Sequence, residues 1–230
     1  MIMRDFLSYS KDSEEVKYLC EKDELFSYAV NYIGTIEYTL HDDAFRHFVD
    51  TIIGQMLSNT VGDVISGRFA ALCDNEITPE RVVSLTIPEL RAIGLSNAKS
   101  EYILNFAHIV SEKPSFFQEL ELKTDDEIRK ELMAIKGIGI WSTNMYLLFV
   151  LGRPDILPTE DGAFAQAVKW LYGYDDHTRE RKSLRKLLSH WSPYSSVASR
   201  YMYRLLDSGI TKTEKNIFVE NKGNVGGTYA

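Results

Sequence analysis

The 230-residue sequence has few cysteines, no long apolar run and little strand signal. Cys20 and Cys73 are too few for a disulfide framework or for a metal or iron–sulfur site with four cysteine ligands. No apolar stretch approaches the roughly 20 residues of a membrane helix, and residues 1–15 lack the apolar segment of a secretory signal. These absences favour a soluble protein in a reduced, cytoplasmic setting.

An excess of positive charge is also missing. The chain has 33 acidic and 26 basic residues, for a formal net charge of -7. Nucleic-acid binding draws on basic surfaces that displace counterions from phosphates, so this balance counts against it. It does not exclude it, because a local basic face can coexist with an acidic remainder.

Apolar residues recur with the 3.6-residue period of a helix through most of the chain. Thr124–Glu127 forms a capping box, and Thr78–Glu80 and Thr86–Glu89 each combine a capping residue, a proline and an acid. Strand-forming residues cluster only within Tyr32–Leu40. We therefore predict an all-α fold. The predicted helices cover Phe45–Leu57, Val61–Leu72, Pro79–Val83, Ala98–Val110, Asp125–Ala134, Trp141–Val150, Gly162–Leu171, Arg179–Leu187 and Ser195–Leu206.

The segment 132–149 places Gly137, Ile138 and Gly139 between an amphipathic helix and an apolar one. Two glycines one residue apart permit positive φ and the close approach of another backbone. The free amides at the start of the second helix favour an anion. By itself the pattern fits either a plain corner between helices or a turn that binds a phosphate.

An acid, Asp161, begins the next predicted helix in the sequence Pro158-Thr-Glu-Asp-Gly. Taken alone, such an acid is an ordinary N-cap. Its neighbour Glu160 is an alternative candidate for any chemistry at this position.

Four motifs, in their order along the chain, resemble those of the helix-hairpin-helix superfamily of DNA glycosylases, in particular the 3-methyladenine DNA glycosylase II group. The hairpin motif matches at Leu132, Ile135, Gly137, Ile138 and Gly139, with Ser142 and Thr143 as its small residues. The other three motifs lie at Ile52–Arg68, Ile93–Lys99 and Trp191–Tyr203. Lys136 stands where the family usually has proline, Glu160 where it has glycine and Ser195 where it has arginine.

The resemblance implies two helical subdomains that flank a DNA-binding cleft. One is discontinuous, formed by residues 1–44 and 154–210, and carries the catalytic acid. The other, residues 45–153, holds the hairpin. Residues 211–230 form a polar C-terminal tail.

The resemblance also implies that Asp161 is the catalytic residue of a reaction that cuts a damaged purine from its sugar. A carboxylate can stabilise the positive charge that builds on the sugar. Relatives that also nick the strand carry a nucleophilic lysine where this chain has Trp141, so we expect a monofunctional, water-using enzyme.

The remaining site residues are expected from the same resemblance. Gln55 contacts the minor groove, Met56 is the apolar wedge that fills the space of a flipped base, and Lys99 contacts a phosphate. The other DNA contacts are Ser58, Gly137, Gly139 and Thr143. The base pocket consists of Trp141, Tyr203, Met145 and Phe45. The main-chain carbonyls of Met133, Ile135 and Ile138 hold a monovalent cation, Na⁺ or K⁺.

The predicted activity is hydrolysis of the N-glycosidic bond of alkylated purines, such as 3-methyladenine or 7-methylguanine, in base excision repair. We expect a monomer that needs no cofactor, acts on duplex DNA containing a damaged base, does not bind membranes, and lies at the nucleoid if the host is a bacterium. Three alternatives stay open: a glycosylase for another lesion, a lesion-binding protein without catalysis, and a helical protein-interaction domain.

Overall fold

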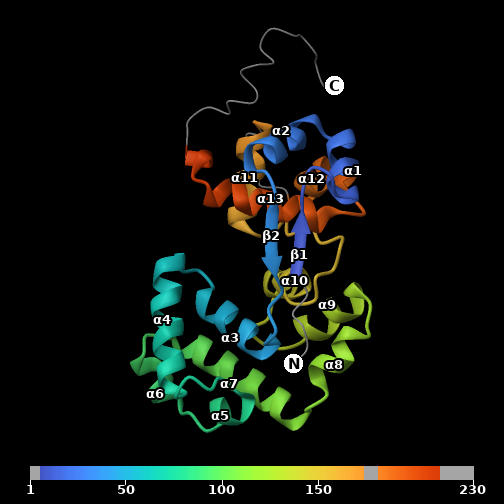
Figure 1. Ribbon diagram of the computed structural model, residues 1–230. Coiled ribbons are helices and arrows are strands. Elements are labelled where there is room, and N and C mark those ends of the chain that lie inside the picture. The colour runs from blue at the N-terminus through green and yellow to red at the C-terminus, as the bar shows by residue number, and fades with distance from the viewer. Residues whose placement is uncertain (1–5, 174–180, 213–230) are drawn as a thin grey trace. The chain divides into compact units, whose positions relative to one another are not determined.

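The computed structural model describes residues 6–173 and 181–212, with the backbone alone for Asn59 and residues 181–183. It divides into two compact units (Figure 1). We call residues 1–40 and 152–230 the split unit and residues 41–151 the hairpin unit. The predicted tail beyond residue 212 and the predicted helical residues 179 and 180 lie outside the described residues.

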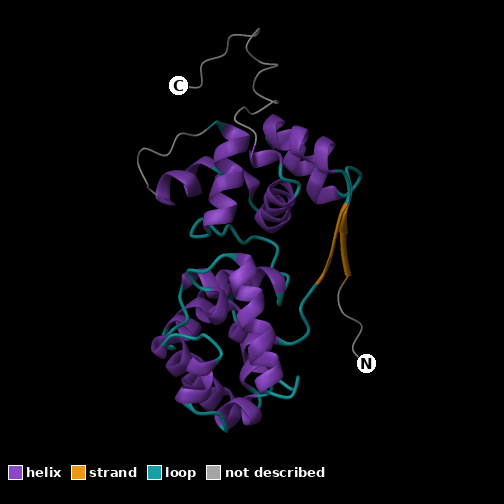
Figure 2. Ribbon diagram, turned by 90° about the vertical axis from the view of Figure 1, so that its left-hand side faces the viewer, coloured by secondary structure: helices purple, strands orange, loops and turns teal. Residues whose placement is uncertain are grey.

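The hairpin unit consists of helices joined by short turns (Figure 2). Its helices are α3 (Ala44–Gly54), α4 (Asn59–Leu72), α5 (Pro79–Val83), α6 (Ile87–Ala92), α7 (Asn97–Glu112), α8 (Phe116–Glu121), α9 (Asp125–Met133) and α10 (Ile140–Phe149).

The predicted start signals are confirmed in this unit. Thr124 and Thr86 each accept a hydrogen bond from the amide three residues on, and Glu127 and Glu89 complete the two capping boxes. Thr78 caps α5 over the predicted bounds. The sequence pattern did not reveal α8, because six residues are too few to display a helical period and its N-cap, Ser115, makes no capping hydrogen bond of the kind that marks α5.

Aromatic rings form the centre of the hairpin unit. The ring of Phe48 lies 5.1 Å, between centroids, from each of the rings of Phe106 and Tyr146. Phe45 stacks on Phe106 at 5.6 Å. Rings of this size bury a large apolar area, and they join α3, α7 and α10 around the hairpin that α9 and α10 form.

The split unit brings together segments far apart in the sequence. Its elements are β1 (Phe6–Tyr9), α1 (Glu14–Lys22), α2 (Glu24–Ile33), β2 (Ile36–Thr39), α11 (Gly162–Tyr172), α12 (Arg181–Leu187), the 3₁₀ turns η1 (Ser189–Trp191) and η2 (Ile210–Lys212), and α13 (Ser195–Asp207). One apolar core joins the N-terminal and C-terminal segments, and its largest buried members include Phe26, Phe164, Trp191 and Tyr201.

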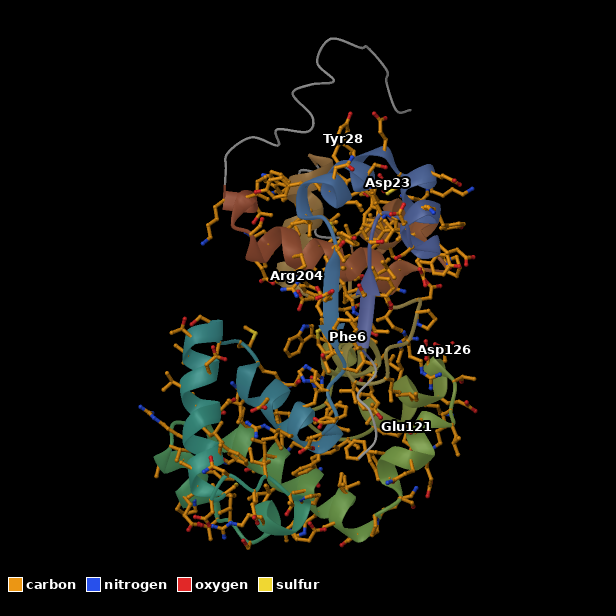
Figure 3. The ribbon with its side chains drawn as sticks, in the orientation of Figure 1. Phe6, Asp23, Tyr28, Glu121, Asp126 and Arg204 are labelled. Carbon is orange, nitrogen blue, oxygen red and sulfur yellow. The ribbon has the colours of Figure 1, made fainter. Side chains whose placement is uncertain are left out.

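A two-stranded antiparallel ribbon is the exception to the all-α prediction, which the predominantly helical structure otherwise confirms. Phe6 pairs with Thr39 and Tyr9 with Ile36. The ribbon packs on α13, the helix that carries Arg204 (Figure 3). The Tyr38 hydroxyl donates to the Arg200 carbonyl at 3.1 Å, and Arg204 lies over the Tyr38 ring. The pattern at 32–40 predicted β2 but not β1, whose partner lies thirty residues away in sequence.

Asp23 holds the split unit together from a buried position (Figure 3). Its Oδ2 accepts hydrogen bonds from Trp191 Nε1 at 2.9 Å and from the Tyr172 hydroxyl, and lies 2.8 Å from His190 Nε2. Oδ1 accepts from the Phe26 amide and so caps α2. Burial raises the pKa of Asp23, but these hydrogen bonds outweigh it, and the pKa lies below its ordinary value.

Among the residues that the structure describes, none of the helices combines the length and apolar character required to cross a bilayer.

We expect Asp23→Asn to lower the free energy of unfolding at pH 7 by about 2–3 kcal/mol, because the buried donors around residue 23 would lose their charged acceptor. Urea denaturation measures the change, with the exposed Asp12→Asn as control. The folded-state pKa is depressed, so the advantage of the wild type is full above about pH 4 and shrinks as the pH falls through that pKa. A difference that grows on acidification would contradict this role.

Candidate active site

The hairpin turn between α9 and α10 contains two glycines that serve different purposes. Gly137 has φ +97°, and an added Cβ would lie 2.3 Å from Cγ of Tyr102. Only glycine fits there. Gly139 has φ −109° and is the N-cap of α10, so it presents no side chain to the first amides of the helix. That end of α10 therefore suits an anion such as a phosphate.

Two residues that are predicted to contact DNA also stabilise this turn. Gln55 Nε2 donates to the Gly137 carbonyl at 3.0 Å, and the Thr143 hydroxyl donates to the Gly139 carbonyl at 3.0 Å. Thr143 is fully buried. Both side chains therefore help to fix the backbone that presents the α10 amides, and their predicted contact with DNA stays a prediction.

Lys99 has a similar task at the end of α3. Its Nζ donates to the carbonyls of Ile53 at 2.8 Å and Gln55 at 2.6 Å. A cation at a helix C-terminus satisfies carbonyls that have no helical partner. Burial lowers the pKa of this ammonium group. The residue predicted to hold a phosphate thus anchors the segment that leads to Met56.

Met56 lies at the tip of the turn between α3 and α4. The Leu57 amide donates to the Gly54 carbonyl at 3.1 Å, which closes a β-turn across Gln55 and Met56. Met56 has φ +59°, and its side chain is 101% exposed. A left-handed residue with a side chain costs roughly 1 kcal/mol. Ser58 then caps α4 through the Val61 amide. The protein therefore holds an apolar side chain in solvent at the expense of local strain.

Asp161 lies at the start of α11 in the split unit. Its Oδ1 accepts from the Phe164 amide at 2.7 Å, and its own amide donates to the Pro158 carbonyl at 2.9 Å. Asp161 is 8% exposed. Tyr203, a predicted pocket residue, lies at the same helix start, because its ring centroid is 6.3 Å from that of Phe164. Burial raises the pKa of its phenol, and the Asp161 charge raises it further. The structure thus brings these two predicted residues together.

Glu160, the alternative acid, is engaged elsewhere. Its Oε1 accepts from the Thr159 hydroxyl at 3.1 Å and lies 3.7 Å from Arg185 Nη2. Asp161 therefore caps α11, whereas Glu160 forms an ion pair with Arg185.

Residues 49–193 match the family model for HhH-GPD superfamily base excision DNA repair proteins. This chain belongs to that superfamily. The match spans the hairpin, the Met56 turn and Asp161.

Relatives of this superfamily member align along most of the chain. The alkylbase DNA glycosidase-like protein mag2 of Schizosaccharomyces pombe is 29% identical over 85% of the chain and 96% of its own length. The crystal structure of a DNA-3-methyladenine glycosidase from Bacillus halodurans has a TM-score of 0.78 and 28% identity, over 94% of this chain and 99% of that one. That of the S. pombe 3-methyladenine DNA glycosylase in complex with abasic DNA has a TM-score of 0.76 at 21% identity, over 85% and 97%, and supports the fold. The alignments with five further relatives cover 42–58% of the length of each relative.

The remaining predicted pocket residues of this HhH-GPD member lie in the hairpin unit. Trp141 is half-buried in the first turn of α10, and Met145, one turn later, is 7% exposed. Phe45 is 4% exposed and belongs to the aromatic core through its stacking on Phe106. Their assignment to a base pocket stays a prediction.

Sequence reasoning missed two residues that shape the site. Tyr102 fills the space under Gly137, and no local pattern marks it because it lies 35 positions earlier. Arg185 pairs with Glu160. Here a signal existed, since an acid in place of the usual glycine requires a partner when it is nearly buried.

We expect Gly137→Ala to lower the free energy of unfolding by about 2 kcal/mol or more, because the new Cβ meets both an unfavourable φ and the Tyr102 ring. Gly139→Ala is the matched control and should change it by less than about 1 kcal/mol, since its φ is open to any residue. Denaturant unfolding of the two variants gives the comparison. Equal losses would show that the turn does not depend on Gly137 in this way.

Proposed function

We propose that this protein is a monofunctional DNA glycosylase that hydrolyses the N-glycosidic bond of alkylated purines, such as 3-methyladenine or 7-methylguanine, in duplex DNA. The observation that carries the proposal is the buried carboxylate of Asp161, fixed by the Phe164 amide at the place where the family resemblance puts the catalytic acid. The printed names of the mag2 protein and of the B. halodurans glycosidase support the substrate class.

The chemistry follows from the leaving group and the acid. A purine alkylated on a ring nitrogen carries a positive charge, so it leaves with the electron pair of the C1′–N bond without needing a proton. Positive charge then develops on the sugar, where a fixed carboxylate stabilises it. Water adds to C1′ and loses a proton, which yields a free base and an abasic site. The cap bond to Phe164 fixes Oδ1 of Asp161 before substrate arrives, so little reorganisation is needed.

Trp141 supports the monofunctional part of the proposal, in which the enzyme removes the base but does not cut the strand. It occupies the position of the lysine that forms a Schiff base in strand-nicking relatives, and an indole cannot attack the sugar as an amine does. We therefore infer that the abasic strand is left uncut.

DNA is the proposed partner of both units, and the protein is proposed to act as a monomer. The hairpin offers the amides of α10 to a phosphate. The carbonyls of Met133, Ile135 and Ile138 would hold a monovalent cation. Carbonyl oxygens suit such an ion, and the Ile135 oxygen, which accepts the Ile138 amide at 3.1 Å, keeps a second lone pair. A bound cation would add positive charge beside that phosphate. The reaction itself is proposed to need no cofactor.

A lesion-binding protein without catalysis is the second candidate. The net charge of -7 and the replacement of the usual glycine by Glu160 favour it. Both candidates use the Met56 wedge, and only the first releases base.

We expect Asp161→Asn to keep the fold, because asparagine caps helices as well as aspartate does, and to reduce base release by about 100-fold or more, because the charge is lost. Release of methylated purines from alkylated duplex DNA is the measurement. Asp43→Asn, which changes the N-cap of α3 in the same way, is the matched control. Near-normal release by the Asp161 variant would remove the assignment, and tight lesion binding by an inactive wild type would favour the second candidate.

We expect Met56→Gly to leave the free energy of unfolding within about 1 kcal/mol of the wild type, since relief of the positive φ offsets the added chain entropy. Its affinity for an abasic duplex should fall about tenfold, because an inserted apolar side chain is lost. Fluorescence anisotropy gives the affinity, with Leu122→Ala as a control at another strongly exposed apolar residue. Unchanged binding would rule out the wedge.

A further inference from the structure

Positive charge is unevenly divided between the two units. The hairpin unit has 16 acidic and 10 basic residues, a net charge of -6, which leaves 17 acidic and 16 basic residues for the split unit, a net charge of -1. DNA binding is strengthened by cations that neutralise phosphates. The unit with the hairpin is therefore the less suited of the two to supply them.

The cations of the hairpin unit are also engaged within it. Eight of its ten basic side chains contact an acid or a carbonyl. Six are in ion pairs: Arg46, Arg81, Lys113, Lys123, Arg129 and Lys136. Lys99 and Arg68 donate to main-chain carbonyls. Most cations of the hairpin unit thus already have a partner within it.

The split unit contains a short helix of opposite character. The seven residues of α12 read Arg-Lys-Ser-Leu-Arg-Lys-Leu, with four cations and no acid. Leu184 and the following Leu188 are buried in the core of the unit, which fixes the inner face of the helix. Arg185 and Lys186 are exposed.

Arg185 connects this positive charge with the loop that carries Asp161. Its Nη2 lies 3.5 Å from the Thr159 hydroxyl and 3.7 Å from Oε1 of Glu160, the residue next to Asp161. Both contacts use the same nitrogen, and 59% of the side chain is exposed. Because a guanidinium group has five donors in a planar fork, Arg185 can keep the Glu160 contact and bind a further anion.

We propose that Arg185 and Lys186 form a phosphate-binding surface for the DNA backbone beside the damaged nucleotide. This surface adds positive charge to that of the hairpin unit, and the contacts with Thr159 and Glu160 show that Arg185 lies beside the loop of Asp161. The inference rests on the proposed binding of duplex DNA, and it adds a contact outside the four sequence motifs.

The test is the salt dependence of binding to an abasic duplex, measured by anisotropy from about 50 to about 200 mM KCl. For the double variant Arg185→Gln/Lys186→Gln we expect the slope of log K against log[salt] to decrease in magnitude by about 2, with a loss of affinity of about tenfold or more at the lowest salt. The matched control is Lys17→Gln/Lys22→Gln, which removes the same charge from exposed positions of α1. Lys17 lies among the acidic residues Asp12, Glu14 and Glu21. We therefore expect the salt slope of this control variant to stay at the wild-type value.

A third variant separates phosphate binding from a purely structural role. Glu160→Gln removes the carboxylate that Arg185 contacts and leaves the cation in place, so the slope should be unchanged. An equal loss of affinity in this variant would mean that Arg185 acts only through Glu160, and would overturn the proposal. A slope for the double variant equal to that of the control or of the wild type would also overturn it.

Base release, assayed on the same preparations, separates this proposal from the proposed function. Normal release by the wild type with an unchanged slope in the double variant would defeat the phosphate surface alone. A slope that depends on Arg185 and Lys186, in a wild type that releases no base, would defeat the catalytic proposal and support the surface. A wild type without affinity for DNA would defeat both.

Discussion

The hydrogen bond from the Phe164 amide to Asp161 joins the fold of this protein to its proposed chemistry. A helix start needs an acceptor for its first amides, and a reaction that builds positive charge needs a carboxylate that is already in place. One side chain meets both needs. The helix itself therefore holds the acid, and α11 is in turn held by the apolar core that joins the two ends of the chain. The residue proposed for the chemistry is therefore also the N-cap of α11.

The parts of the molecule that sequence could predict are those with local causes. The capping boxes at Thr86 and Thr124 depend on residues three positions apart, and the Gly137–Gly139 turn separates two periodic helices, so these features were predicted and found. Asp161 at the start of α11 was also readable, because Pro158 and Gly162 bracket it. The family match then confirmed the fold that the ordered motifs implied.

What the sequence could not predict depends on contacts between distant residues. The two carbonyl contacts of Lys99 are an example, because an isolated lysine after a Gly-Leu-Ser turn carries no sign of the Ile53 and Gln55 carbonyls that it binds. Strand β1 needs β2 as its partner, and the Asp23 cluster joins residue 23 to residues 172, 190 and 191. Four residues of strand or one acid give no periodic signal. Such features become visible only when the chain is folded.

The left-handed backbone at Met56 has a consequence for how this protein can change over time. Selection or engineering for thermal stability alone would favour glycine or asparagine at position 56, since both relieve the strain of the positive φ. Because the Met56 side chain is exposed, the replacement would not disturb the packing of other residues. A lineage that retains a bulky apolar residue at this position does so against that tendency. Under the proposed wedge role, the residue at position 56 among close homologues predicts which of them insert a side chain into damaged DNA.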